Sequence, residues 1–243
     1  MGDMTRLRYM EEMQRVDADA RVAGVLTEND RAIVVLDETI FYPQGGGQPF
    51  DKGIIESDSA RFRVDETRFA DGVVRHIGAF ERGEFQEGEA VRLEVDRGRR
   101  ALMSRLHSAG HVVDMAVNAI GRDWIPGKGY HFPEGPYVEY AGALGESERD
   151  GLKAEIERRA NELVSRAIET SIRFLDRDEM KNVCHFVPDY VPEGKPSRVV
   201  FYGTFGVPCG GTHVANLGAI GVIVIRKLKP SGGTVRVSYD IAR

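Results

Sequence analysis

The stretch Arg105-Leu106-His107-Ser108-Ala109-Gly110-His111 lies inside the run of residues that decides the fold of this chain. From Asp96, a typical helix cap, apolar residues recur every three or four positions until Gly121, so the spacing predicts one long helix. On such a helix, His107 and His111 lie one turn apart on the same face, about 5 to 6 Å from each other. The two imidazoles are therefore placed to share one metal ion.

A second pair of metal-binding side chains occurs in Pro208-Cys209-Gly210-Gly211-Thr212-His213, with Cys209 98 positions (209 − 111) after His111. The two glycines disfavour a helix and indicate a tight loop that brings the thiol and the imidazole together. Zinc prefers such nitrogen and sulfur donors in tetrahedral sites. We therefore predict one Zn²⁺ per chain, with the ligands His107, His111, Cys209 and His213.

Each of these motifs also has an alternative interpretation. Two histidines four residues apart are by themselves more often ordinary helix residues than half of a metal site, and the Cys/His loop is what favours a metal. Zinc metalloproteases place their general base, a glutamate, directly after the first histidine. Here that position is Ser108, which excludes the metalloprotease interpretation.

The composition is that of a globular protein in the cytoplasm. The chain has 243 residues, 42% of them hydrophobic and 29% charged, and no 18-residue apolar window or signal-like start, so we expect no membrane partner. Its formal charge of −5 argues against indiscriminate polyanion binding, and we expect no DNA partner, although a local basic face stays open. Only Cys184 and Cys209 are available for a disulfide, which the histidine context disfavours.

Residues 1–95 are expected to form a small β-rich, barrel-like domain. Short apolar segments follow one another at regular spacing, beginning with Arg21–Leu26 and Arg31–Asp37 around a turn-forming insert. The segment Phe41–Asp51 interrupts this pattern with Gly45, Gly46 and Gly47. These glycines can expose N–H groups to a carboxylate, phosphate or ribose oxygen, or form a flexible hairpin loop, and spacing alone favours neither.

Residues 96–243 are expected to form a second domain that contains the metal site. The first turns of its long helix carry Arg99, Arg100 and Arg105, which are either a solvated face or phosphate contacts if the substrate is a nucleic acid. His131 is interpreted as a surface or packed histidine rather than a catalytic one. A second helix is expected to start with a capping box at residues 147–150.

The later segments, the last of them Thr234–Ile241 with strict alternation, predict an antiparallel sheet. Two long helices packed on this sheet, preceded by the barrel-like domain, make the fold class α+β, with a two-layer second domain.

The chain resembles the AlaX-type proteins, freestanding relatives of the editing domain of alanyl-tRNA synthetase. The resemblance rests on the glycine-rich segment Phe41–Asp51, on Arg105–His111 and on the segment Cys209–Val214. The order and spacing of these motifs cover nearly the whole chain. Its length and its separate front domain are similar to those of the medium-sized members.

This resemblance implies a trans-editing hydrolase that deacylates alanine tRNA mischarged with serine or, secondarily, glycine. It implies that the same four histidine and cysteine side chains bind zinc, and that Gln48 lies at the editing pocket. Family members commonly have threonine at the position of Ser108, so the hydroxyl is kept and the methyl is lost. We expect Gln48, Ser108 and Thr212 to be the catalytic-site candidates that contact the serine hydroxyl, and the three glycines and three arginines above to contact the RNA or substrate.

The chemistry is consistent with that role. An apolar synthetic pocket rejects an added hydroxyl by no more than about 10²-fold, so a second, hydrolytic sieve is needed. Four protein ligands, however, are typical of a closed structural zinc, whereas a catalytic zinc keeps one position open. Either one ligand, Cys209 first, yields when substrate binds, or zinc only shapes the pocket. Three competing interpretations stay open: a non-catalytic, zinc-stabilised RNA-binding module, an editing hydrolase for another aminoacyl-tRNA, and a metal hydrolase of unrelated small esters.

Overall fold

The structure is a computed structural model that describes residues 4–242. Two compact units are present. The first comprises the residues up to Gly45 together with Pro49–Leu102, and the second comprises Gly46–Gln48 together with the residues from Met103 onward. The predicted domain boundary at residues 95/96 lies next to the start of α1 (Arg97–Ala119), and the border between the units falls inside that helix.

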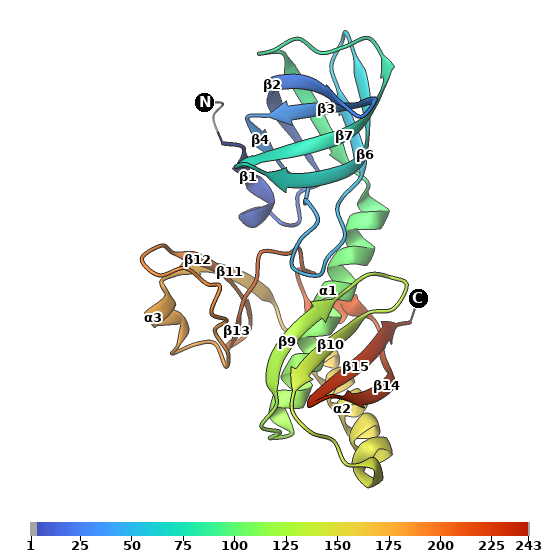
Figure 1. Ribbon diagram of the computed structural model, residues 1–243, viewed down its shortest axis with the longest axis vertical. Coiled ribbons are helices and arrows are strands. Elements are labelled where there is room, and N and C mark those ends of the chain that lie inside the picture. Colours follow the sequence, from blue (N-terminus) through green and yellow to red (C-terminus); the bar gives the residue numbers. More distant parts are fainter. Residues whose placement is uncertain (1–3, 243) are drawn as a thin grey trace. The chain divides into compact units, whose positions relative to one another are not determined.

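The first unit is built around a barrel (Figure 1). Between Asp17 and Val95, six antiparallel strands close in the order β2-β3-β7-β6-β5-β8, which confirms the predicted barrel-like fold. Their bounds are β2 Asp17–Glu28, β3 Arg31–Leu36, β5 Gly53–Glu56, β6 Arg61–Ala70, β7 Val73–Arg82 and β8 Ala90–Val95. The short strands β1 (Arg6–Leu7) and β4 (Glu38–Thr39) pair in parallel, and a 3₁₀ turn, η1 (Arg8–Met10), follows β1.

The barrel encloses a core of alternating apolar residues, among them Phe41, Phe62 and Leu93, each at 0% exposure. Beside this core, the buried Arg100 forms an ion pair with Asp51. The remaining guanidinium N–H groups donate to the main-chain carbonyls of Ile40 at 2.7 Å, of Met13 at 3.1 Å and of Arg15 at 3.3 Å. Arg100 thus ties together three segments of the first unit.

The long helices form as the sequence predicts, with one difference at a terminus. The Asp96 carboxylate accepts a hydrogen bond from the Arg99 N–H at 2.9 Å and so caps the start of α1, as expected. The second helix, α2 (Arg149–Ser165), does not begin with the predicted capping box at residues 147–150. A 3₁₀ turn, η2 (Glu146–Glu148), precedes it, and the Glu148 carboxylate accepts from the Gly145 N–H at 3.3 Å instead.

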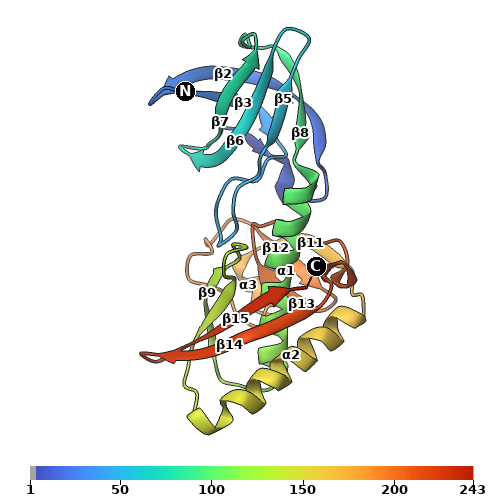
Figure 2. The ribbon, with the colours of Figure 1, turned by 90° about the vertical axis from the view of Figure 1, so that its right-hand side faces the viewer.

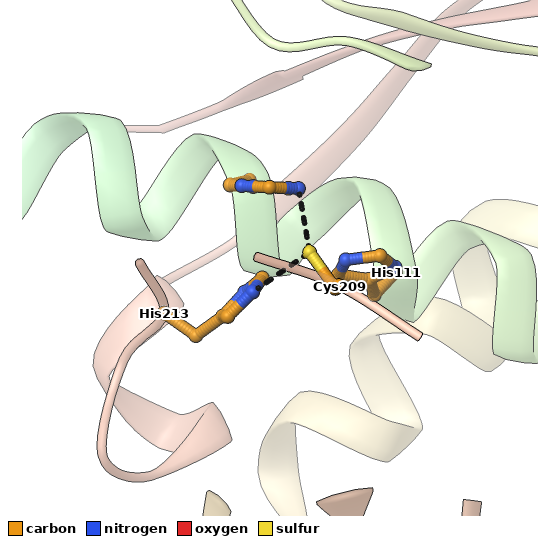
Figure 3. Close-up of side chains that lie close together, drawn as sticks. His111, Cys209 and His213 are labelled. Atoms are coloured by element: carbon orange, nitrogen blue, oxygen red, sulfur yellow. Dashed lines mark hydrogen bonds between the residues drawn. The ribbon is translucent and has the colours of Figure 1, made fainter. Parts of the chain in front are cut away.

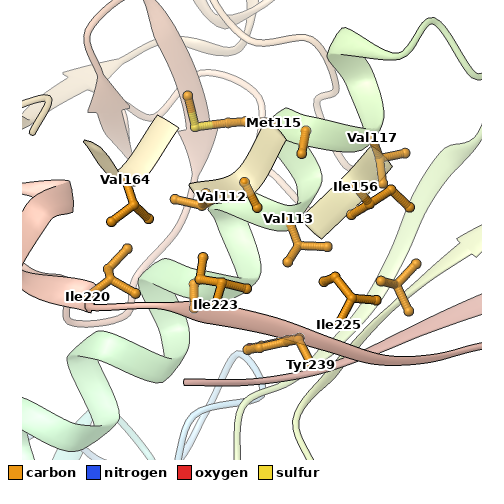
Figure 4. Close-up of a cluster of buried hydrophobic side chains, with 14 of the residues drawn as sticks. Val112, Val113, Met115, Val117, Ile156, Val164, Ile220, Ile223, Ile225 and Tyr239 are labelled. Atoms are coloured by element: carbon orange, nitrogen blue, oxygen red, sulfur yellow. The ribbon is translucent and has the colours of Figure 1, made fainter. Parts of the chain in front are cut away.

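In the second unit, α1 and α2 pack on a sheet in the strand order β14-β15-β10-β9, and Figure 2 shows α2 lying along this sheet. Its strands are β9 Ile125–Tyr130, β10 Tyr137–Ala141, β14 Ile223–Ser231 and β15 Thr234–Ile241. Figure 4 shows the apolar layer between them, where Val112 and Val113 of α1 and Ile156 of α2 face Ile225 and Tyr239 of the sheet. The predicted alternation along the last strand is confirmed.

The remaining strands form a separate sheet in the order β11-β12-β13, where the sequence had suggested one sheet. They are β11 Thr170–Leu175, β12 Ser197–Tyr202 and β13 Phe205–Pro208, and a short helix, α3 (Arg177–Met180), follows β11. The split follows from the connection after β13, which runs through Cys209–His213 and a 3₁₀ turn, η3 (Leu217–Ile220). This connection lets β14 pair with β15 alone on that side. The α+β class is unchanged.

Both cysteines are free thiols. Among residues 4–242, no helix has the length and the apolar character that crossing a membrane requires.

Candidate metal centre

Four side chains of the second unit converge on one point, as predicted from the two motifs. One ligand atom from each of His107, His111, Cys209 and His213 lies within 4.8 Å of the others. Helix α1 supplies the first two from successive turns of one face, and the loop after β13 supplies the other two. Figure 3 shows the Cys209 sulfur between the histidine rings. This group can hold a metal ion.

The orientation of the rings agrees with that role. The Nε2 atoms of His107 and His213 lie 3.5 Å and 3.3 Å from the Cys209 sulfur. The Nε2 atom of His111 is buried and has no hydrogen-bond partner within the described part of the chain. A buried polar atom without a partner is costly unless something binds it. A metal ion at the centre of the group would satisfy it, so the residues present fit a metal.

Burial also sets the charge of the ligands. Desolvation lowers the pKa of His111 to about 4, and it lowers the pKa of His107 and of His213 well below the ordinary value. All three imidazoles are therefore neutral near pH 7 and offer a lone pair to a metal. Desolvation raises the pKa of the Cys209 thiol, and the nearby Arg198 guanidinium opposes that shift. Metal binding would release the thiol proton.

Gln48 holds His107 from the side away from the thiol. Its Oε1 accepts hydrogen bonds from His107 Nδ1 at 2.7 Å and from the Thr212 N–H at 3.0 Å, and its Nε2 donates to Thr212 Oγ1 at 2.9 Å. Thr212 Oγ1 also lies 2.8 Å from Ser104 Oγ. Gln48 and Thr212 are both at 0% exposure, so the glutamine fixes the ring orientation of His107 from within the protein.

Ser108 and Tyr202 do the same for His213. Tyr202 Oη lies 2.9 Å from His213 Nδ1, and Ser108 Oγ lies 3.4 Å from the same nitrogen. Ser108 Oγ also accepts from the Val214 N–H at 3.1 Å and is fully buried. The three predicted catalytic-site residues, Gln48, Ser108 and Thr212, are thus brought together around the ligands. Their contact with a serine hydroxyl stays a prediction.

Two further residues position the ligand loop. The buried Arg198 of β12 donates from Nη1 to the carbonyls of Cys209 at 2.6 Å and Gly211 at 2.8 Å. At Gly211 a side chain is impossible without movement, because an added Cβ would lie 2.2 Å from His107 Cε1. The sequence carries a signal for the glycine, which lies inside the ligand motif, but none for an arginine 11 residues before Cys209.

His131 is packed, as expected, and it is packed against the metal group. Its ring stacks on His107 with 4.4 Å between centroids, and its Nδ1 lies 2.6 Å from Tyr239 Oη. The Tyr239 hydroxyl donates its proton to the Leu106 carbonyl at 2.9 Å, so His131 Nδ1 must be the donor to Tyr239. Desolvation lowers the pKa of His131 to about 3, which agrees with this neutral tautomer.

His185 and Asp114, which no sequence motif marks, form a pair near the metal group, and Asp114 lies about one turn after His111 on α1. Asp114, at 8% exposure, has Oδ2 3.3 Å from His185 Nε2, and the His185 ring stacks on Phe205 with 4.7 Å between centroids. Asp114 raises and His185 lowers the pKa of His111, after the larger effect of desolvation. The contact ties the segment after α3 to α1 beside the metal group.

Comparisons with known proteins identify the family of the chain. A family model described as "Threonyl and Alanyl tRNA synthetase second additional domain" matches residues 197–237, which include two of the four candidate ligands. A model described as "tRNA synthetases class II (A)" matches residues 5–99. "Alanyl-tRNA editing protein AlaX-L" of Pyrococcus horikoshii is 31% identical over 96% of this chain and 57% of its own length. The chain belongs to the AlaX-type alanyl-tRNA editing family.

The chain is also similar to parts of alanine–tRNA ligases. An "Alanine--tRNA ligase" of Methanothrix thermoacetophila is 33% identical over 96% of this chain, and one of Paracidovorax citrulli is 33% identical over 85%. The chain spans 25% and 22% of the lengths of these two ligases.

The glycine-rich segment of the family motif contributes to both units. Gly45 and Gly46 are exposed, and the Gly47 carbonyl accepts from the His131 N–H at 2.8 Å. Gly47 has a φ of +77°, and a Cβ there would lie 2.2 Å from the Gly129 carbonyl oxygen. The close approach of two main chains therefore requires glycine at this position and fixes Gln48 beside His107.

The three arginines selected from the sequence differ in availability. All five guanidinium N–H donors of Arg100 are bonded within the protein, so none is left for a phosphate. Arg105 donates to the carbonyls of Ile220 and Ala242. Arg99 is partly exposed and donates from Nε to the Phe50 carbonyl at 2.8 Å, and no carboxylate within residues 4–242 pairs with it.

Proposed function

We propose that this protein is an aminoacyl-tRNA ester hydrolase that removes serine, and secondarily glycine, from mischarged alanine tRNA. The observation that carries the proposal is the convergence of three neutral imidazoles and one thiol on a single point, in a chain of the alanyl-tRNA editing family. The coarser role, editing of alanyl-tRNA, is what the family supports. Its tRNA partner and its amino acid substrates belong to the proposal.

We propose zinc as the ion, because nitrogen and sulfur donors in a group of four are the set that zinc prefers. Bound zinc would supply a Lewis acid that polarises the ester carbonyl and a positive charge that lowers the pKa of a nearby water. The chain's own residues hold the donors in place. Gln48 and Thr212 fix His107, whereas Tyr202 and Ser108 fix His213.

The exposure of the ligands gives a direction of approach. His107 and His213 are at 1% and 0% exposure, whereas His111 and Cys209 are partly exposed. We infer that a substrate ester approaches on the side of His111 and Cys209, the less buried residues of the four. Of the four, Cys209 would be the ligand to yield, because Arg198 holds its main-chain carbonyl and not its sulfur.

Hydrolysis at such a site can provide the discrimination between serine and alanine that editing requires. Serine and alanine differ by one hydroxyl, which a synthetic pocket cannot reject by more than about 10²-fold. A pocket that bonds the hydroxyl of serine spares alanine, since a buried partner left unpaired costs about 1 to 3 kcal/mol. Gln48, Ser108 and Thr212 remain our proposed sources of that contact, directly or through a rearrangement of their present bonds.

Two other functions have specific support. Four protein ligands are typical of structural zinc, which favours a non-catalytic RNA-binding module. The family model that matches residues 197–237 also includes the threonyl synthetases in its description, which favours an editing hydrolase for another tRNA. Neither function predicts that the protein releases serine from alanine tRNA and spares alanine, so the amino acids released distinguish both from the proposal.

The decisive experiment is release of labelled amino acid from Ser-tRNA, Gly-tRNA and Ala-tRNA, all on alanine tRNA, by native and zinc-stripped protein. We expect fast loss of serine, slower loss of glycine, no loss of alanine, and no activity after stripping. Cys209→Ala should lose zinc and activity. Cys184→Ala is the matched control, because Cys184 is a buried thiol outside the metal group. Binding of the RNA without release of any amino acid would establish the RNA-binding module instead.

A further inference from the structure

The segment between α3 and β12, residues 181–196, packs on the strand pair that leads to Cys209. Its residue Val191 is buried at 4% exposure in a small apolar cluster with Val199 and Cys184. Val199 pairs across the sheet with Pro208, the residue before Cys209. The packing of Val191 therefore places this segment on the strand pair that ends at the thiol ligand.

Tyr190, the neighbour of Val191, is 81% exposed. It is the large apolar side chain with the highest exposure among the described residues. No ring contact or hydrogen bond involves its side chain within residues 4–242. A tyrosine ring normally gains free energy from burial, and the exposed ring of Tyr190 lacks most of that gain.

The segment holds Tyr190 in this exposed place. Arg177 of α3 donates from Nη1 to the carbonyls of Pro188 at 3.2 Å and Val191 at 2.5 Å, on either side of the tyrosine. Its Nη2 also lies 3.5 Å from the Asp189 carboxylate. Arg177 and the buried Val191 thereby fix the main chain around Tyr190.

The electrostatics agree with the placement that the packing of Val191 gives. Although most of the Tyr190 side chain is exposed, partial burial raises its pKa, and the charge of a Cys209 thiolate adds to that shift. The hydroxyl is therefore neutral near pH 7.

We propose that Tyr190 is a stacking platform for the unpaired nucleobase at the aminoacylated 3′ end of the RNA, next to the accessible side of the metal group. This inference rests on the proposed function, because the ester to be cleaved is attached to the ribose of that nucleotide. Stacking on an exposed aromatic ring is the usual way in which proteins bind unpaired bases. It positions the nucleotide without reading its sequence.

The chemistry around Tyr190 favours a base over other occupants. The charged residues exposed near Tyr190 in the chain are Asp189, which pairs with Arg177, Glu193 and Lys195, and they add no apolar surface. No second large apolar side chain within residues 181–196 is strongly exposed, so the apolar area is too small for a protein interface. A single flat ring among polar and charged residues matches the face of one nucleobase.

The test compares Tyr190→Ala, Tyr190→Phe and Tyr190→Trp in the zinc-loaded protein. Base stacking predicts that Tyr190→Ala weakens binding by about 5- to 150-fold. We expect this as a higher KM for Ser-tRNA and a higher Kd for uncharged alanine tRNA, with kcat and zinc content unchanged. Tyr190→Phe and Tyr190→Trp should bind as the wild type does, because they keep the ring. Phe174→Ala, which removes a 48% exposed ring from β11, is the matched control.

A second substrate makes the test specific for the terminal base. With alanine tRNA that lacks its last nucleotide, the wild type and Tyr190→Ala should have equal Kd values. An undiminished affinity in Tyr190→Ala, a loss in Tyr190→Phe, or the same loss with the truncated RNA would each overturn the proposal. These outcomes can be distinguished from a failure of the proposed function. If the proposed function is wrong, the wild type releases no amino acid, and the Kd comparison on uncharged RNA still decides the role of Tyr190.

Discussion

Replacing Gln48 by leucine tests whether the centre depends on the residues behind its ligands. The substitution keeps the volume roughly constant and removes the oxygen that accepts from His107 Nδ1 at 2.7 Å and from the Thr212 N–H at 3.0 Å. Both donors are buried, and leaving one buried donor unpaired costs about 1 to 3 kcal/mol. We therefore expect Gln48→Leu to lower the free energy of unfolding by about 2 to 6 kcal/mol in the metal-free protein.

The same change frees the ring of His107. Loss of a residue that orients a metal-binding histidine typically weakens metal binding about 10- to 100-fold. We expect a decrease of that size in zinc affinity, measured by competition with a chelator of known affinity. Gln48→Glu is predicted to keep most of the affinity, because a carboxylate accepts from both donors and from the Thr212 hydroxyl.

The matched control is Gln44→Leu, four residues earlier in the same segment, where the side chain is exposed. It should change neither unfolding nor zinc affinity. If Gln48→Leu bound zinc within about twofold of the wild type and unfolded at the same denaturant concentration, the reasoning from the hydrogen bonds of Gln48 would be wrong.

Three other predictions concern single residues. Arg100→Met leaves the buried Asp51 charge without its partner and should destabilise the first unit by about 3 to 5 kcal/mol in denaturant unfolding, whereas Arg99→Met should cost less than about 1 kcal/mol. Burial lowers the pKa of His76 to about 4 from 6.5, so its contribution to stability is complete above pH 6.5 and is lost as pH falls toward 4. The decrease in unfolding free energy between pH 7 and pH 4 should be about 3 kcal/mol smaller in His76→Gln than in the wild type. Arg198→Met, which removes the donors to the Cys209 and Gly211 carbonyls, should weaken zinc binding about tenfold in the chelator assay without changing the number of bound ions.

Local patterns in the sequence predict much of this structure. Alternation and turn residues predict the barrel strands, and the three- to four-residue spacing after Asp96 predicts α1 together with its cap. The metal group is also predictable, because one pair of ligands is fixed by helix geometry and the other by a glycine-containing loop. In each case the determining residues are close neighbours in the chain, so the pattern contains the geometry.

Contacts between distant residues were harder to predict. Arg198 supports the ligand loop from another strand, and Asp114 contacts His185 across 71 positions (185 − 114). Neither pair has a characteristic spacing. The same reason explains why Arg100, which the sequence allowed as a phosphate contact, pairs with Asp51 in the structure. It also explains why the division of the later strands into two sheets was not predicted.

A group of four protein ligands raises the question whether the metal would be structural or catalytic. The surroundings of the four ligands differ, and these differences bear on that question. A structural zinc site is expected to fix every ligand, whereas a catalytic one needs a position that can change. Here His107 and His213 are buried and held through Nδ1, by Gln48 and by Tyr202 respectively. Cys209 is a partly exposed residue, and its sulfur lies 3.5 Å from His107 Nε2, 3.3 Å from His213 Nε2 and 3.4 Å from the Gly211 nitrogen, while Arg198 holds only its main chain. The Cys209 side chain would therefore be the ligand to yield to a substrate, while its main chain stays in place.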